Sequence, residues 1–200
     1  MTRPRPFPEH ETAEYVGTAL AFHFINRVVS SLLSEQMLPG GVEKYRLVRR
    51  TAGRSLAATV RRDLRPGTSL SLLGTAGEAP PWAAGSPVGT AYGALLSAAH
   101  QGAGLLSDED AAFVRKSVAG WDGVTPLPLN APLPDRTERP GARLALLAAR
   151  APYRITDEDV AAWRVPPFTD HCLVHLIAFG AICAVERVEA AMRTTAGERT

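Results

Sequence analysis

Cysteine is scarce in this chain, with Cys172 and Cys183 as the only two among 200 residues. Two cysteines are too few for the disulfide framework of a small secreted domain. An excess of charge of either sign is also missing, since 22 basic residues face 20 acidic ones and the net charge is +2. A balance this even argues against nucleic acid or an anionic membrane as the main partner. We therefore expect neither.

Long apolar runs are absent as well. The N-terminal stretch MTRPRPFPEHETAEY lacks the apolar core of a secretory signal. No run reaches the roughly 18 uninterrupted apolar residues that cross a bilayer. These two absences predict a cytoplasmic protein.

The sequence also lacks the pattern of a β-strand. Its β-branched residues do not alternate with polar ones in short runs bounded by turn signals. Hydrophobic residues make up 46% of the chain, which is enough for a sizeable core. We predict an all-α fold, a helical bundle in a single domain at 1–200. The expected helical segments are 12–34 (starting between Glu9 and Thr12), 42–64, 88–106, 107–121, 142–155 (ended by Pro152), 156–163 and 169–194.

Several of these helices have recognisable starts. Ser107 and Thr156 each precede a run of acidic residues, which is the pattern of a helix N-cap followed by a first turn that favours negative charge. Thr169 or Asp170 is expected to cap the last helix.

The segment 65–87 is rich in Gly, Pro and Ser and predicts a long connection. Trp82 lies within it and is expected to pack back on the body of the protein. Before it, the segment 42–64 carries many arginines, which we interpret as a solvated helix face rather than an anion site.

The first and last long helices echo each other at a spacing of 160 residues. Ile25-Asn26-Arg27-Val28 aligns with Val185-Glu186-Arg187-Val188. The echo predicts a pseudo-repeat of two helical units. A partial unit at 1–65 and a second at 88–195 would be joined by 65–87.

The echo also suggests how the arginines are paired, because a buried arginine needs a partner. We expect Arg27 and Asn26 to tie the two units together through loop carbonyls or Glu186. Arg187 would in turn bind an acid such as Glu14.

Two segments carry a family resemblance. AEYVGTALAFHFINRVVSSLLSEQMLPG, with its turn at Phe24 to Val28, resembles a segment of actinobacterial members of the alkylhydroperoxidase D-like, or carboxymuconolactone decarboxylase-like, superfamily. ARLALLAARAPYRITDEDVAAWR, followed by the last helix, resembles the second unit of double-length members. The resemblance implies an all-helical and commonly oligomeric protein.

One departure from that family bears on activity. Its peroxidase members carry Cys-x-x-Cys at a helix start, with a His four residues after the second Cys and a Glu upstream. A helix N-terminus and a nearby base lower the pKa of a thiol there, and the second thiol resolves the sulfenic acid. This chain has no Cys-x-x-Cys. The dithiol activity therefore cannot be assigned to residues of this chain.

Cys172 and Cys183 do not replace the missing pair. Eleven residues along one helix place them roughly 16 Å apart, whereas a disulfide needs Cα atoms within about 7 Å. We interpret both as small buried hydrophobic residues. Cys172, near the helix start and one turn before His175, is the better candidate for a thiolate.

His171 and His175 lie at i and i+4 and share a helix face. This spacing is found in paired-histidine zinc sites, but the sequence fixes no third ligand and Asp170 points elsewhere on the helix. We expect no metal. Either histidine is a candidate general acid or base, and a role in capping or lining the core is the alternative.

His23, Asn26, Arg27 and Ser30 form a polar stripe on an otherwise apolar helix. Because Phe22 and Phe24 flank His23, we expect this histidine at the base of a hydrophobic pocket. Burial there would lower its pKa and leave a neutral base.

These residues support three hypotheses. The first is a cofactor-independent enzyme of small-molecule, conceivably biosynthetic, metabolism that uses a histidine to move protons in a decarboxylation, isomerisation, elimination or cyclisation of a small hydrophobic substrate. The second is a non-catalytic or partner-dependent subunit, working as a homo-oligomer or with a hetero-partner. The third is a residual thiol peroxidase that uses Cys172. The predicted catalytic residues are His23, His171 and His175, and the predicted substrate-binding residues are Phe22, Asn26, Arg27, Cys172 and Glu186.

Overall fold

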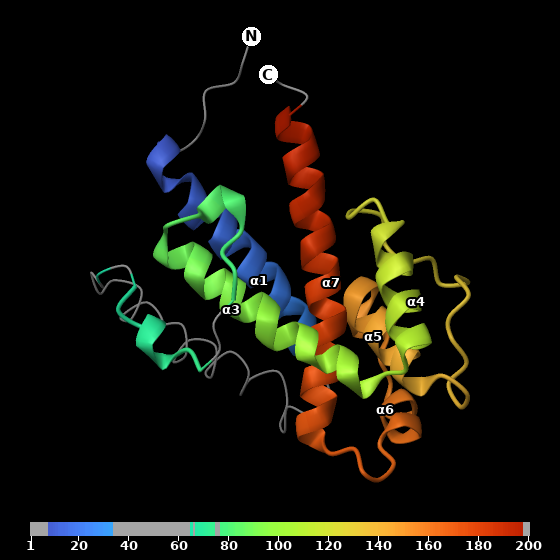
Figure 1. The fold of residues 1–200 in the computed structure, drawn as a ribbon. Helices are drawn as coiled ribbons and strands as arrows, with labels where there is room; N and C mark the ends of the chain where they lie inside the picture. Colours follow the sequence, from blue (N-terminus) through green and yellow to red (C-terminus); the bar gives the residue numbers. More distant parts are fainter. Residues whose placement is uncertain (1–7, 34–64, 66, 75–76, 198–200) are drawn as a thin grey trace, which may run out of the picture.

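The structure, a computed structural model, describes residues 8–33, 65, 67–74 and 77–197. These residues form α-helices and short 3₁₀ helices and no strand, so the all-α prediction is confirmed (Figure 1). The α-helices are α1 (Thr12–Leu32), α3 (Pro87–His100), α4 (Asp108–Ala119), α5 (Pro140–Arg150), α6 (Asp157–Trp163) and α7 (Asp170–Gly197). The 3₁₀ helices are η1 (Glu9–Glu11), η3 (Leu70–Leu72), η4 (Pro81–Ala83), η5 (Gln101–Leu105) and η6 (Pro152–Arg154).

The arginine-rich helix expected at 42–64 lies outside the described residues. The partial repeat unit at 1–65 falls largely on the same part of the chain. The pseudo-repeat therefore stays a prediction.

Helix α7 forms the centre of the bundle. It contacts α1 and α3 on one side and α4 and α5 on the other (Figure 1). Leu176, Ile177, Phe179, Ile182 and Val185 are fully buried along it. The stretch Asp170–Arg193 is long and apolar enough to cross a membrane, but 56% of its apolar window is buried inside the fold. It therefore has the character of a core helix.

Helices α5 and α7 approach each other at backbone distance. A Cβ atom added at Gly180 of α7 would overlap the carbonyl group of Ala145 on α5. Around this crossing, Leu144, Ala145 and Ala148 of α5 are fully buried. Glycine at position 180 is thus required by the packing of the two helices.

The predicted N-caps are confirmed. The Ser107 side chain accepts a hydrogen bond from the backbone N–H of Asp110. Thr156 and Asp159 form a reciprocal capping box. The Thr169 hydroxyl oxygen accepts from the backbone N–H of Cys172 at 3.4 Å, which identifies Thr169 rather than Asp170 as the cap of α7.

Trp82 packs back on the body, as predicted. Its indole N–H donates to Glu189 Oε1 of α7 at 3.0 Å, and the hydroxyl of Tyr92 on α3 donates to Oε2 at 2.9 Å. Glu189 is only 6% exposed, so these two bonds satisfy a buried carboxylate. The connection before α3 is thereby joined to the central helix.

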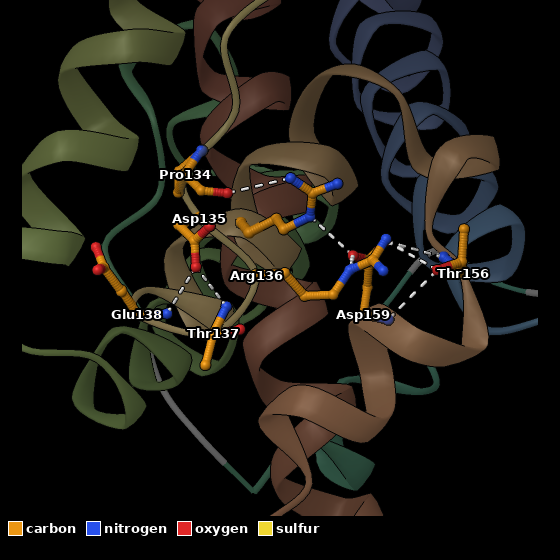
Figure 2. A network of polar contacts seen from close by, with 8 residues as sticks. Pro134, Asp135, Arg136, Thr137, Glu138, Thr156 and Asp159 are labelled. Atoms are coloured by element: carbon orange, nitrogen blue, oxygen red, sulfur yellow. Dashed lines mark hydrogen bonds and ion pairs between the residues drawn. The ribbon is translucent and has the colours of Figure 1, made fainter.

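A second buried carboxylate, Asp159 of α6, holds the Pro-rich connection before α5 (Figure 2). Its Oδ1 accepts from Nε of Arg136 and Nε of Arg143, both at 2.7 Å, and Oδ2 accepts from the backbone N–H of Thr156. Arg143 also donates to the Pro134 carbonyl at 3.1 Å. Burial opposes ionisation of Asp159, but the bonds from Arg143, Thr156 and Arg136 hold its pKa below the usual value.

We expect Asp159→Asn to lower the free energy of unfolding by about 3 to 5 kcal/mol, because it leaves two guanidinium groups facing a neutral side chain. The folded-state pKa of Asp159 lies below its unfolded value of about 3.9. Its contribution is therefore complete above that value and is lost as the pH falls through the folded-state pKa. Urea denaturation of both proteins from pH 7 to pH 3 measures this difference.

Asp157→Asn is the matched control, because Asp157 is an exposed carboxylate in the same helical turn. It should change stability by no more than about 0.5 kcal/mol. Equal effects of the two substitutions would contradict the assigned role of Asp159.

Candidate functional site

The polar stripe of α1 opens into a groove of about 360 Å³. We call it the His23 groove. Its lining residues are His23, Asn26, Arg27 and Ser30 of α1, Trp121, Gly123, Val124 and Pro126 of the connection after α4, and Arg150, Pro152 and Tyr153 at the end of α5 and in η6. The four stripe residues therefore face one site, as their helical spacing implies.

The two sides of α1 explain this placement. Leu20 is fully buried, and Phe24 and Val28 pack against the core from the same helix. The stripe lies to one side of these anchors. The face of α1 that holds the helix on the bundle thus determines which polar residues reach the groove.

The opposite wall is shaped by a tight turn after Trp121. The Asp122 carboxylate accepts hydrogen bonds from the backbone N–H groups of Val124 and Thr125, both at 2.8 Å, and from the Thr125 hydroxyl. These bonds, led by the Thr125 hydroxyl, lower the pKa of Asp122 to about 2. Gly123 has a φ of +88°, a conformation that favours glycine.

His23 does not lie at the base of a closed hydrophobic pocket, and that expectation is wrong. The residue is exposed on the wall of an open groove, whose lining combines apolar side chains with polar and cationic ones. Partial burial, and then the charge of Arg27, lower the pKa of His23. The expected direction of the shift was correct, whereas the expected surroundings were not.

The contact with Arg27 determines which nitrogen of His23 carries the proton. Arg27 Nη1 lies 2.7 Å from His23 Nδ1. A guanidinium can only donate, so Nδ1 accepts and the proton of the neutral ring lies on Nε2. His23 therefore offers the groove an Nε2–H donor, and its basic nitrogen, Nδ1, is occupied by Arg27.

The expected exchange of ion pairs between the two long helices is also wrong. Arg27 Nε donates to the Ala149 carbonyl at 2.9 Å, and Arg187 donates to the Trp121 carbonyl. Glu186 binds His100 instead, with its Oε1 2.9 Å from Nε2 of the imidazole. The alternative expectation, that Arg27 ties elements together through carbonyl groups, is confirmed.

The remaining predicted site residues lie outside the lining of the His23 groove. His171 and His175 stack edge to face on α7 with ring centroids 4.6 Å apart. Among the described residues, no group of three or more potential ligands gathers to hold a metal. Phe22 points outward from α1 and is 64% exposed. The structure thus brings together His23, Asn26 and Arg27, and it separates them from the others.

Seven residues of the groove were missed by sequence reasoning: Trp121, Gly123, Val124, Pro126, Arg150, Pro152 and Tyr153. The guanidinium carbons of Arg27 and Arg150 lie 5.7 and 5.4 Å from the centroid of the Trp121 ring. Each is within the range of a cation–π contact. The sequence offered one signal for this contact: Arg150 lies at the end of a predicted helix, two residues before the helix-ending Pro152.

Comparison with known proteins identifies a related sequence. It is 40% identical over 92% of its length to a curated alkyl hydroperoxide reductase of Mycobacterium tuberculosis. This match supports the resemblance to the alkylhydroperoxidase D-like superfamily. It spans 56% of the length of that relative. No protein-family model matches the chain, and no solved structure matches it significantly.

The two cysteines of the chain both lie on α7, and neither belongs to a Cys-x-x-Cys. A hydrogen bond from the Thr169 hydroxyl, at 3.5 Å from Sγ, lowers the pKa of the Cys172 thiol. Burial raises the pKa of Cys183 to about 12. Cys183 is a buried hydrophobic residue, as expected, whereas Cys172 is partly exposed.

We expect iodoacetamide at pH 7.5 to alkylate Cys172 in the folded protein and to leave Cys183 unmodified, since only a thiolate reacts. Peptide mass spectrometry locates the modification. Thr169→Val should slow the reaction, because the hydrogen bond that stabilises the thiolate is lost. Alkylation of Cys183 at the same rate would contradict this assignment.

Proposed function

We propose that this alkylhydroperoxidase D-like chain is a cofactor-independent enzyme that uses His23 to transfer a proton to a small organic substrate in the His23 groove. The observation that carries the proposal is the 2.7 Å contact of Arg27 with His23 Nδ1. It gives a neutral imidazole with its Nε2–H available, at a position lined by three further donors: Asn26, Ser30 and Tyr153. Its products would be those of decarboxylation, isomerisation, elimination or cyclisation.

The chemistry follows from the tautomer. Reactions of these classes pass through an enol or enolate, in which negative charge develops on an oxygen. A neutral imidazole N–H hydrogen-bonds such an oxygen and delivers a proton to it. The adjacent Arg27 cation stabilises the imidazolate that this leaves, which takes a proton back from water. Because the pKa of His23 is lowered, the ring stays neutral at physiological pH.

The size of the site suits a small substrate. A groove of about 360 Å³ is at the lower end of the range for small-molecule sites. Trp121, Val124, Pro126 and Pro152 offer apolar surface beside the polar stripe. We therefore propose a small substrate whose apolar body contacts these residues and whose polar end lies near His23.

Removing the imidazole with His23→Ala should reduce turnover by about 100-fold or more, the usual range for loss of an acid–base group. We would incubate the protein in D₂O with a panel of small ketones and keto acids and follow deuterium entry next to the carbonyl by proton NMR.

His10→Ala is the matched control, since His10 is exposed on η1, far along the chain from the stripe, and should leave the rate unchanged. Exchange that is unaffected by His23→Ala would overturn the proposal. Exchange abolished by alkylation of Cys172 would favour the thiol peroxidase hypothesis instead.

A second function, as a self-associating subunit, is favoured by the outer face of α1. Phe22, Ile25, Val29 and Leu33 are 64, 53, 44 and 51% exposed. Their spacing of three and four residues places them in one stripe, the pattern of a helix that packs against another helix. A single stripe is self-complementary in an isologous dimer. We therefore propose a second copy of the chain as its partner.

Ile25→Glu should convert the assembly to a monomer, because it places a charge in the centre of the stripe. Sedimentation equilibrium measures the mass of both proteins. Leu72→Glu is the control, since Leu72 is an exposed apolar residue on η3, outside the stripe. A wild-type chain that stays monomeric at all concentrations would overturn self-association in favour of a hetero-partner.

A further inference from the structure

Three guanidinium groups meet around Trp121 without an ion-pair partner among the described residues. Arg27 and Arg150 stack on its ring, and Arg187 donates to its carbonyl. None of the three forms an ion pair with a described residue, whereas Arg136, Arg139, Arg143, Arg164 and Arg193 all do. Cations that are partly removed from water without an anionic partner are costly. The surroundings of Trp121 therefore carry an excess of positive charge, which Asp122 near Arg150 offsets only in part.

Hydrogen-bond donors also remain unused at this place. Arg27 uses Nε on Ala149 and Nη1 on His23, which leaves Nη2 without a bond to a described residue. Arg150 Nε is buried and has no partner. Both side chains line the His23 groove. Among the described residues, Arg27 Nη2 and the buried Arg150 Nε thus have no acceptor.

The nearest acidic residue in the sequence does not satisfy them. Asp122 follows Trp121 directly, but its two carboxylate oxygens accept bonds from Val124 and Thr125 within its own turn. The Asp122 carboxylate therefore accepts hydrogen bonds from its own loop and none from Arg27 or Arg150. No carboxylate of the described residues therefore occupies the donors of Arg27 and Arg150.

We propose that the His23 groove binds a small organic monocarboxylate, whose carboxylate group is received by Arg27 and Arg150 while its apolar body lies along the groove. The inference rests on the proposed function, because it names the class of substrate for that same site. A planar guanidinium matches the geometry of a carboxylate, with two parallel N–H···O bonds.

The surroundings favour one negative charge over two. Arg150 is the last residue of α5, and the Ala149 carbonyl that binds Arg27 belongs to the same last turn. The carbonyl end of a helix carries partial negative charge, and the Asp122 carboxylate adds a full one close to Arg150. A dianion such as phosphate is repelled more strongly there than a monocarboxylate.

Benzoate, its neutral isostere benzamide and inorganic phosphate are the probes for this site, used with the full chain in isothermal titration calorimetry at pH 7. We expect saturable binding of benzoate, with benzamide and phosphate at least tenfold weaker. Arg27→Gln and Arg150→Gln should each weaken benzoate binding about tenfold, the loss expected for one charge-assisted hydrogen bond.

Arg164→Gln is the matched control, since Arg164 binds Asp170 outside the groove and should leave benzoate affinity unchanged. Should Arg150→Gln fail to fold by circular dichroism, Arg150→Lys replaces it, because lysine keeps the charge and loses the planar fork. We expect Arg150→Lys to bind benzoate more weakly than the wild-type chain.

The imidazole gives an independent readout. A carboxylate bound beside His23 favours the protonated ring, so the pKa of His23 followed by proton NMR should rise when benzoate is added. In Arg150→Gln the same rise should require about tenfold more benzoate.

The results separate this inference from the proposed function. His23→Ala should still bind benzoate within about threefold of the wild-type affinity, so loss of turnover with intact binding supports both. If the chain binds benzoate and His23→Ala retains full turnover, the proposed function is overturned and the carboxylate site is not. Absence of benzoate binding, equal binding of benzamide, or tighter binding of phosphate would overturn the carboxylate site, whatever the turnover.

Discussion

The stacking of two arginines on the buried ring of Trp121 holds the His23 groove together. Trp121 is 7% exposed, and its indole N–H donates to the Thr125 carbonyl at 2.7 Å. This bond fixes the ring, and the ring in turn orients Arg27 and Arg150. Contacts of this kind contribute about 0.5 to 2 kcal/mol each. The position of Arg27 then decides the tautomer of His23, so the chemistry of the groove depends on the placement of one indole.

The thiol chemistry associated with related proteins and the proposed imidazole chemistry involve different parts of this chain. The superfamily is associated with paired thiols at a helix start, and the described relative is an alkyl hydroperoxide reductase. Here the thiol with the lowered pKa lies at the start of α7, whereas the polar groove lies between α1 and η6. A helical scaffold that loses one reactive group retains its other surfaces, and function can be carried by residues on those surfaces.

Local interactions were predictable from the sequence. The caps at Ser107 and Thr156 depend on residues three positions apart, and the structure has both. The stripe on α1 depends only on helical spacing, and its members do share one groove. Trp82 could be predicted to pack against the body of the protein, because burial of a large aromatic ring is favourable.

Interactions between elements were not predictable in the same way. The pairing of Arg27 with Glu186 required the rotation of α1 relative to α7, which the sequence does not encode in a short pattern. His100, at the end of α3, takes Glu186 instead. The exposure of His23 depends on loop 121–126 and η6, which come from distant parts of the chain. The direction of its pKa shift was still correct, because partial burial and a neighbouring cation act in the same sense.

The bond from Arg187 to Trp121 differs from the others at this residue because it ends on the backbone carbonyl. Any amino acid at position 121 would offer the same acceptor, so the attachment of α7 to this loop does not depend on the indole. The two stacked arginines, by contrast, require an aromatic ring. A substitution at position 121 would therefore change the wall of the His23 groove and leave this attachment of the central helix in place.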